Sequence, residues 1–163
     1  MLTHHRCPVC LSFISTDLPI CLELETVATL YQKDQERFHI LLTEPMVREQ
    51  PLPANQRTEL RLPWEATPRL LWMELSPYRA IMTMQGNGQF SYRHFWEQGV
   101  YGLSRYWLQS SHFSQDGQMR LRNFTRQLTF SKNPLPYYLR IDYELWSDTL
   151  RLGHYVLSLE IDH

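Results

Sequence analysis

The sequence lacks the short motifs that would identify a catalytic or cofactor chemistry. It contains no GxSxG, Walker or complete Rossmann glycine pattern: GNGQF at 86–90 lacks the third glycine, and GLSRY at 102–106 lacks the second. Its seven histidines show no spacing that would suggest a catalytic triad. We therefore lean toward a protein that is not an enzyme, and we assign no catalytic residue.

Long apolar runs and a strong net charge are also missing. No run approaches the roughly 20 residues of a membrane-spanning helix, and MLTHHRCPVC at 1–10 lacks the apolar core of a signal peptide. The formal net charge is −1 and the pI is about 6.6, so no overall field would attract nucleic acid. We expect a soluble, cytoplasmic protein with no membrane span and no nucleic-acid partner.

Cysteine is scarce, and its three positions, Cys7, Cys10 and Cys21, all lie near the start of the sequence. This odd, clustered set argues against a secreted disulfide framework. Cys7 and Cys10 have the CxxC spacing of a zinc knuckle, and His4, His5 and Cys21 could add ligands, but a structural zinc site normally pairs two such knuckles. No second CxxC and no HxxxH follows. We expect free thiols, no metal and no cofactor.

Aromatic residues, in contrast, are abundant. They make up 13% of the 163 residues, as nine tyrosines, seven phenylalanines and five tryptophans. Such a content suits a sheet-rich protein or one with a ligand or partner surface. The length fits a single domain over 1–163, which can bury a sizeable core without disulfides.

Period-two alternation predicts β-strands over most of the chain. Leu22, Leu24 and Leu30 alternate with polar residues, and a polar break at 32–36 makes 20–43 a hairpin. The proline-rich stretch 44–56 is expected to be a surface connection. Further strands are predicted within 58–65, 68–85, 119–130, 137–146 and 150–161, with turns at 86–89 and 114–118 and the last three strands as a meander.

One segment breaks this period. Trp96, Val100, Leu103 and Trp107 fall at i, i+4, i+7 and i+11, which predicts a helix over 91–109. We therefore expect an α+β fold: a curved, mostly antiparallel sheet of seven to nine strands packed on this one main helix, with a half-open barrel as the alternative arrangement of the sheet.

The strand predicted at 119–130 has an irregular pattern. Its apolar residues switch parity near Asn123, which one extra residue, a β-bulge, would explain. Arg120 and Arg122 then point outward, where Asp142 and Glu144 of the next strand are available as partners. A second change of parity at Gly153 in the last strand suggests a curved sheet.

Arg126 has a different position in this phasing. It faces inward between Phe124 and Leu128, where a guanidinium needs an acid or an anionic ligand to offset its desolvation. This makes Arg126 the most specific candidate for ligand binding in the sequence. His94, by comparison, is expected on the exposed polar face of the helix, beside Glu97.

For function we favour a binding or assembly protein. It would use an aromatic-rich concave face or sheet edge to hold a protein partner or a hydrophobic or aromatic small molecule, and homo-oligomerisation is a further option. The predicted ligand-binding residues are Arg126, Phe124, Trp96, Trp107 and Tyr143. The alternative is a small lyase or transferase for an anionic aromatic substrate, with Arg126 as the anion anchor and His94 or Glu144 as the acid–base group.

Overall fold

The computed structural model describes residues 4–44, 69–85, 90–108 and 118–163, and every regular element in these ranges is a β-strand. The strands are β1 (His4–Ser15), β2 (Cys21–Gln32), β3 (Phe38–Glu44), β4 (Arg69–Leu75), β5 (Arg79–Gln85), β6 (Phe90–Glu97), β7 (Tyr101–Leu108), β8 (Gln118–Lys132), β9 (Pro136–Ser147) and β10 (Leu150–Ile161). They close into one antiparallel barrel in the order β1-β10-β9-β8-β7-β6-β5-β4-β3-β2. The described residues contain no helix that could cross a membrane.

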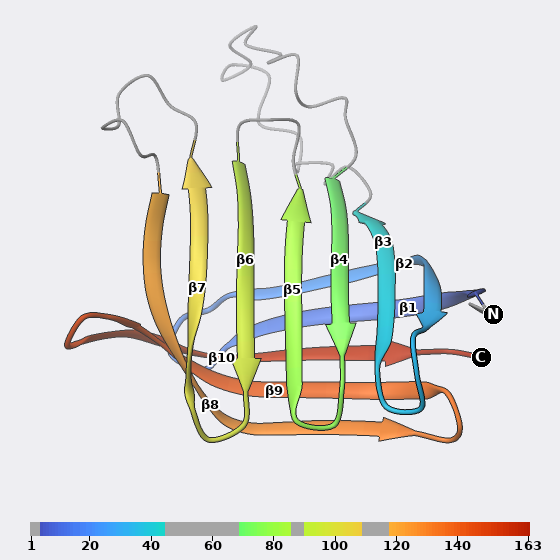
Figure 1. Cartoon of the computed structure of the whole chain (residues 1–163). Helices are drawn as coiled ribbons and strands as arrows, with labels where there is room; N and C mark the ends of the chain where they lie inside the picture. The colour runs from blue at the N-terminus through green and yellow to red at the C-terminus, as the bar shows by residue number, and fades with distance from the viewer. Residues whose placement is uncertain (1–3, 45–68, 86–89, 109–117) are drawn as a thin grey trace, which may run out of the picture.

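The barrel is flattened into two layers of strands that cross each other (Figure 1). Strands β3 to β7 run side by side in one layer, and β9, β10 and β1 run across them in the other. The long strand β8 belongs to both layers, because it pairs with β7 through its first half and with β9 through its second half. At a corner of this kind a strand commonly carries a bulge.

Alternating apolar side chains explain why β2 to β5 form strands and close around a core. Phe38, Ile40 and Leu42 on β3 are fully buried, and each lies opposite a buried or inner-facing residue of the adjacent strand, as Ile40 lies between Leu30 and Met73. The intervening side chains face solvent. This is the alternation of an antiparallel sheet with one face packed on the core and the other in solvent, and the solvent face of β3 and β4 also carries the apolar residues Leu41, Leu70 and Trp72.

The predicted helix over 91–109 is wrong, because this segment forms β6 and β7, joined by a tight turn. Gly99 in the turn has φ +75°, a conformation that favours glycine. Trp96 points into the barrel whereas Leu103 faces solvent, so the apparent helical stripe does not lie on one face. The fold is therefore an all-β closed barrel of ten strands, not an α+β sheet of seven to nine strands on a helix, and not a half-open barrel.

Other predictions of strands are confirmed. The hairpin at 20–43 is β2 and β3, and the predicted C-terminal meander is β8, β9 and β10. A register shift between Arg151 and Gly153 confirms the irregularity in the last strand. All but the first residue of the connection at 44–56, the strand at 58–65, the turn at 86–89 and most of the turn at 114–118 lie outside the described residues.

The bulge in β8 exists, but it lies at Arg126 and not at Asn123. Thr125 pairs with Tyr143 and Gln127 with Asp142, which leaves Arg126 as the extra residue. The parity of the side chains changes at this later point. Asn123 and Thr125 therefore face the interior, and Arg126 and Phe124 face outward, opposite to the prediction.

Candidate functional site

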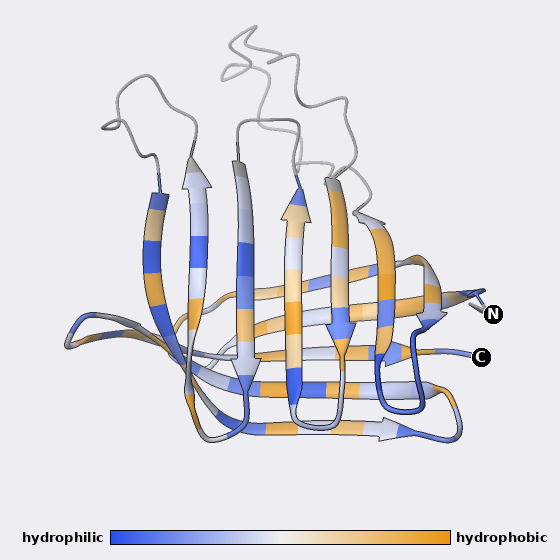
Figure 2. Ribbon diagram, in the orientation of Figure 1, coloured by the Kyte–Doolittle hydropathy of each residue, from blue (hydrophilic) through white to orange (hydrophobic). Residues whose placement is uncertain are grey.

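The interior of the barrel divides into two chemically different halves. The apolar half is lined by aliphatic side chains together with one methionine and one phenylalanine. Its residues are Leu30, Phe38, Ile40, Leu42, Leu71, Met73, Leu75, Leu139, Ile141 and Leu159. The polar half contains the inner-face aromatic and neutral polar side chains from β6 to β10, together with two leucines that pair with Ser104 and Asn123: Tyr92, His94, Trp96, Ser104, Tyr106, Leu121, Asn123, Thr125, Tyr143, Leu145 and Tyr155. In Figure 2, where each strand is coloured by the residues of both its faces, β6 carries more hydrophilic colour than β4 and β5.

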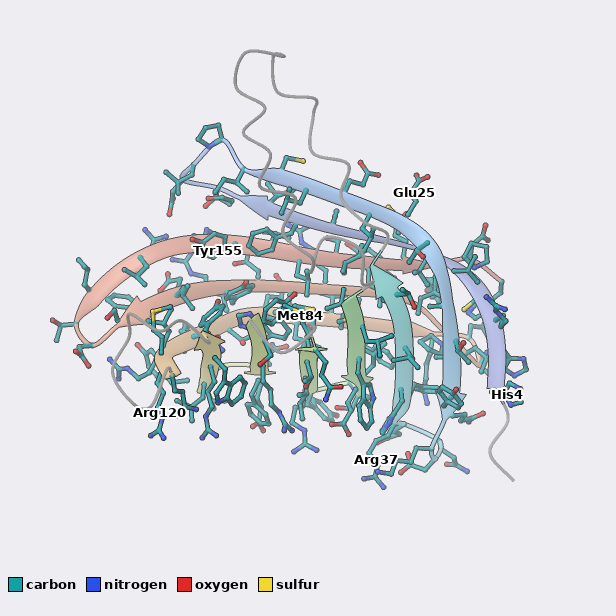
Figure 3. The ribbon with its side chains drawn as sticks, turned by 90° about the horizontal axis from the view of Figure 1, so that it is seen from above. His4, Glu25, Arg37, Met84, Arg120 and Tyr155 are labelled. Atoms are coloured by element: carbon teal, nitrogen blue, oxygen red, sulfur yellow. The ribbon has the colours of Figure 1, made fainter. Side chains whose placement is uncertain are left out.

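Aromatic rings connect the buried centre of the polar half to its margin. Trp96 is fully buried, stacks on His94 with ring centroids 5.0 Å apart, and lies 5.3 Å from the ring of Tyr143. Tyr143 is followed by Tyr155 at 5.7 Å, and Tyr155 stacks on the half-buried Phe13 at 5.1 Å. Seen from above in Figure 3, Tyr155 lies between the two layers, whereas Arg120 projects away from them.

A second branch of rings runs along β6 and β7. His94 makes edge contacts with Tyr92 at 5.2 Å and Tyr106 at 5.3 Å, and both tyrosines are half-buried. Burial, followed by the proximity of Tyr155, raises the pKa of Tyr106 to about 12. Burial also raises the pKa of Tyr143 well above its usual value, with smaller contributions from Tyr106, Tyr155 and Tyr92. The phenol groups of Tyr106 and Tyr143 therefore stay protonated at neutral pH.

A hydrogen-bond chain passes through this cluster. Asn123 Nδ2 donates to Ser104 Oγ at 2.9 Å, which leaves the Ser104 hydroxyl hydrogen for His94 Nδ1 at 2.7 Å. With Nδ1 as an acceptor, neutral His94 carries its proton on Nε2, 3.4 Å from the Tyr106 oxygen. Strand pairing aligns the chain, because His94 lies directly opposite Ser104.

The buried imidazole of His94 is uncharged at neutral pH. Burial lowers the pKa of His94 to about 4, because the imidazolium would lose its hydration without gaining an acid as a partner. The expected position of His94 on an exposed helix face is therefore wrong, since only 6% of the residue is exposed. The polar half, as far as the described residues define it, thus offers hydrogen-bonding groups and a neutral imidazole.

Three buried polar atoms of the polar half have no hydrogen-bond partner within the described residues: Trp96 Nε1, Asn123 Oδ1 and Thr125 Oγ1. The residues lie on neighbouring strands around Gly102, which pairs with Asn123. A Cβ on Gly102 would lie 3.0 Å from Asn123 Oδ1 and 2.0 Å from the backbone oxygen of Phe95. Glycine at this position therefore lets β6 and β8 approach each other.

The structure brings together two of the five predicted ligand-binding residues. Trp96 and Tyr143 lie against each other in the polar half. Trp107 lies on the outer face of β7, and Phe124 packs on the outside against Tyr101, with ring centroids 5.0 Å apart. The apolar parity of the sequence placed Phe124 inside because it did not allow for polar inner residues before the bulge.

Arg126 is 49% exposed and forms an ion pair with Glu144, so the prediction that it faces the core is wrong. Glu144 also accepts from Trp146 Nε1 at 3.1 Å and lies 3.9 Å from Arg151. Arg120 and Arg122 do point outward, but they contact Gln118 and the backbone of Asp148 rather than the predicted acids. Arg126 and Glu144 therefore lie outside the barrel, apart from His94.

Sequence reasoning missed Ser104, Asn123, Thr125 and Tyr106. The signal was present as period-two alternation, since 102, 104 and 106 alternate with larger or charged residues, as do 121, 123 and 125. A search for apolar residues cannot find an inner face that is built from serine, asparagine and threonine. The helix predicted over 91–109 resulted from the same error.

The CxxC sequence does not form a metal knuckle. Cys7 is buried inside the barrel and Cys10 lies on the outer face of β1, so the two thiols point to opposite sides of the strand. Outside, Cys10 Sγ and the carboxylates of Glu23 and Glu25 lie within 4.8 Å of one another. Partial burial, followed by the hydrogen bond to Glu23, raises the pKa of Cys10 to about 11, which disfavours the thiolate that a metal binds.

Comparisons with known proteins support the fold alone. No protein-family model matches the chain, and no curated protein matches it. A solved structure, the ywiB protein from Bacillus subtilis, is similar to it with a TM-score of 0.56 and 12% sequence identity, over 97% of this chain and 94% of that chain. At this identity the likeness carries no information on function.

Proposed function

We propose that the protein binds a small, uncharged, planar molecule inside the barrel, against the polar half. The observation that carries the proposal is the concentration of aromatic rings and neutral hydrogen-bonding groups in one half of an otherwise apolar interior. Small-molecule sites are mostly apolar and aromatic with a few convergent polar groups, and the interior of a β-barrel is a frequent place for them. The interior carries both features around His94 and Trp96.

The charge of the site supports an uncharged ligand. His94 is neutral, and the phenols of Tyr106 and Tyr143 stay protonated. A charged ligand would lose its hydration here and find no counter-ion among the described interior residues. Planarity is favoured because the polar half is rich in flat aromatic rings, with those of Trp96 and His94 stacked at only 4° between their planes.

The free-energy cost of burying polar side chains supports a ligand-binding role of the polar half over a purely structural role. Each buried polar side chain stabilises the fold less than a well-packed apolar one, and networks with unsatisfied members are the least favourable. The other half of the same barrel is filled by aliphatic side chains, so the fold does not require polar residues. A departure from local packing rules of this kind is expected at functional sites.

The test is a fluorescence titration with N-phenyl-1-naphthylamine, an uncharged aromatic probe, alongside the anionic 8-anilinonaphthalene-1-sulfonate. We expect saturable binding of the uncharged probe and at least about tenfold weaker binding of the anionic one. Tyr143→Leu should weaken binding of the uncharged probe about tenfold, because it removes a ring that contacts Trp96. Absence of saturable binding would contradict the proposal.

The matched control is Trp72→Leu. Trp72 is an aromatic residue of the outer face, 49% exposed, so its removal should leave binding of the probe unchanged. An equal loss of binding in both variants would show that the probe binds the exterior. Near-UV circular dichroism of both variants establishes that they are folded.

The alternative partner class, another protein, has a different place on the molecule. Strand register puts Trp72 beside Leu41, and Leu70 beside Thr43, on the outer face of β3 and β4, and all three apolar side chains are exposed. Exposed apolar residues that are contiguous are typical of interaction surfaces. This alternative stays a prediction, and it does not account for the polar interior.

A further inference from the structure

Three arginines lie side by side on the outer face of β6, β7 and β8. Strand register places Arg93 directly opposite Arg105, and Arg105 directly opposite Arg120. Neighbouring strands are about 4.8 Å apart, so the three Cα atoms span about 10 Å across the sheet. Figure 2 shows strongly hydrophilic bands at a similar height on these three strands, and in Figure 3 the labelled Arg120 projects away from the barrel. The three guanidinium groups thus form one line of positive charge, which we call the arginine row.

The arginine row is not neutralised by the described residues. None of its three members forms an ion pair with them, and the one side-chain hydrogen bond of the row there runs from Arg120 to the neutral Gln118. Glu97, the one acid on the outer face of β6, β7 and the first half of β8, lies opposite Arg79 of β5. Like charges that lie directly opposite each other destabilise a sheet. An uncompensated row of this kind therefore points to an anionic partner.

The acids that were predicted to neutralise Arg120 are engaged elsewhere. Asp142 contacts His154, and Glu144 pairs with Arg126. The strand that pairs with β8 at Arg120 is β7, which places a further arginine there and not an acid. The net charge of −1, from which we expected no nucleic-acid partner, describes the whole chain and does not exclude a positive patch on one face.

Aromatic side chains flank the arginine row on the same outer face. Trp107 occupies the next outward position after Arg105 on β7, and Phe95 occupies the next one after Arg93 on β6, and both rings are half-buried. Tyr101, further along β7, is 57% exposed. This face therefore combines cations with flat rings that solvent reaches.

We propose that this face binds single-stranded nucleic acid, with the phosphate backbone along the arginine row and the bases stacked on the flanking rings. A linear polyanion matches a linear row of guanidinium groups, each of which can contact phosphate oxygens in a bidentate manner. Stacking on aromatic side chains accommodates any base, so the binding is tolerant of sequence. The site lies outside the barrel and does not rest on the proposed interior ligand.

Other anionic partners match this face less well. A duplex keeps its bases inside the stack, so their faces do not reach the rings. An acidic peptide neutralises the arginines but leaves Trp107 and Phe95 without a stacking partner. The headgroups of an anionic membrane are spread over a plane, whereas the arginines follow one line. A single strand supplies charge along a line and flat rings in the same polymer.

The test is fluorescence anisotropy with labelled oligothymidylate and oligouridylate of about 12 nucleotides, a length within the site sizes of single-strand binding folds. We expect saturable binding that weakens about 20-fold between about 50 and 200 mM salt, because three phosphate contacts give a logarithmic salt slope near −2. The tighter of the two oligonucleotides identifies DNA or RNA as the partner. Absence of saturable binding, or tighter binding of polyglutamate or phosphatidylserine vesicles, overturns the inference.

Arg105→Gln removes the central charge of the row. We expect about fivefold weaker binding of the oligonucleotide and a salt slope smaller by about 0.7, because one phosphate contact is lost. The Tm of the free protein should stay unchanged or rise, since repulsion along the row is relieved. Arg140→Gln, at an exposed arginine on the outer face of β9, is the matched control and should change neither affinity nor slope. Equal losses in both variants would show that the probe responds to total charge and would overturn the inference.

Trp107→Leu tests the stacking contact separately from the charge. We expect about fivefold weaker binding with an unchanged salt slope, because a base loses its aromatic partner while the phosphate contacts remain. Tyr137→Leu, at a 49% exposed ring on β9, is the control and should leave binding unchanged. Unchanged affinity in Trp107→Leu would remove the reason to prefer nucleic acid over an acidic peptide and would overturn the inference.

The interior and exterior proposals fail independently. Oligothymidylate should not displace N-phenyl-1-naphthylamine, because the two occupy opposite faces of the sheet. Loss of oligonucleotide binding in Arg105→Gln, with binding of N-phenyl-1-naphthylamine unchanged, would support a separate exterior site. Displacement of the interior probe by the oligonucleotide would contradict it.

Discussion

The apolar and polar halves of the barrel have the same strand geometry and opposite interior chemistry. On β3, the alternating inner positions are Phe38, Ile40 and Leu42, whereas on β7 the corresponding alternation presents Gly102, Ser104 and Tyr106. Both strands are antiparallel and are hydrogen-bonded on both sides. Closure of the barrel therefore fixes which side chains point inward but not whether those side chains are apolar or polar. The polar half can thus serve a purpose other than folding.

The two halves should therefore respond differently to mutation. The apolar half contributes through burial, at roughly 25 cal/mol per Å² of apolar surface. The polar half contributes through hydrogen bonds whose net value is modest, about 1 kcal/mol each. Damage to the apolar half should appear mainly in stability, and damage to the polar half mainly in ligand binding.

The largest effect is expected for Phe38→Ala in the apolar half. Phe38 is fully buried and lies near Phe130, so its truncation removes apolar contacts and leaves a cavity. We expect the free energy of unfolding to fall by about 3–5 kcal/mol in urea titrations. Leu41→Ala, on the outer face of the same strand, should cost less than about 1 kcal/mol, and a similar cost for both variants would contradict this account of the core.

Acid should destabilise the protein through the polar half. The folded pKa of His94 is about 4 and the unfolded value is about 6.5, so between these pH values the unfolded chain binds the extra proton. Stability contributed by neutral His94 is therefore complete above pH 6.5 and is lost as the pH falls toward 4, by about 3 kcal/mol. His94→Gln should flatten this part of a pH series of unfolding curves. An unchanged slope in His94→Gln would contradict the prediction.

Gly102→Ala, on β7, tests whether the close approach of β6 and β8 matters for stability and for binding in the polar half. The new methyl group would meet the backbone oxygen of Phe95, which cannot move as a flexible side chain would. We expect a loss of about 1–3 kcal/mol by chemical denaturation, typical of overpacking, together with weaker binding of the uncharged probe. Ser158→Ala, on the outer face of β10, is a control that should change neither, and a neutral Gly102→Ala would show that the close approach of the strands is unimportant.

The smallest effect is expected for Arg126→Met. Arg126 is half exposed, and Glu144 keeps its contacts with Trp146 and Arg151 when the guanidinium is removed. We expect a change below about 1 kcal/mol in unfolding free energy and no change in binding of the interior probe. A large loss of probe binding would reinstate Arg126 as a ligand anchor.

Part of this fold could be predicted from the sequence because it follows the usual rule of apolar residues inside. The hairpin of β2 and β3 and the meander of β8 to β10 have apolar inner residues such as Leu30, Ile40 and Ile141, and their alternation is visible without a structure. The high aromatic content likewise pointed to Trp96 and Tyr143, which do lie together inside the barrel.

The rest could not be predicted, for one physical reason. Where the inner residues are His94, Ser104 and Asn123, an apolar pattern no longer reports which side faces inward. The apolar residues of segment 91–109 then match a helical stripe by coincidence. The sequence pattern also predicts the bulge at Asn123, three residues before its position at Arg126. The same residues that hid the fold are those that form the candidate site, which is where local rules are expected to fail.

The most direct measurement is the NMR signal of the Trp96 indole N–H during addition of N-phenyl-1-naphthylamine, assigned by its absence in Trp96→Phe. Trp72, on the outer face, provides an internal reference in the same spectrum. The account predicts a saturable shift of the Trp96 signal with the Trp72 signal unchanged. A shift of Trp72 with Trp96 unaffected would place the probe outside the barrel and contradict the claim that the polar half is a ligand site.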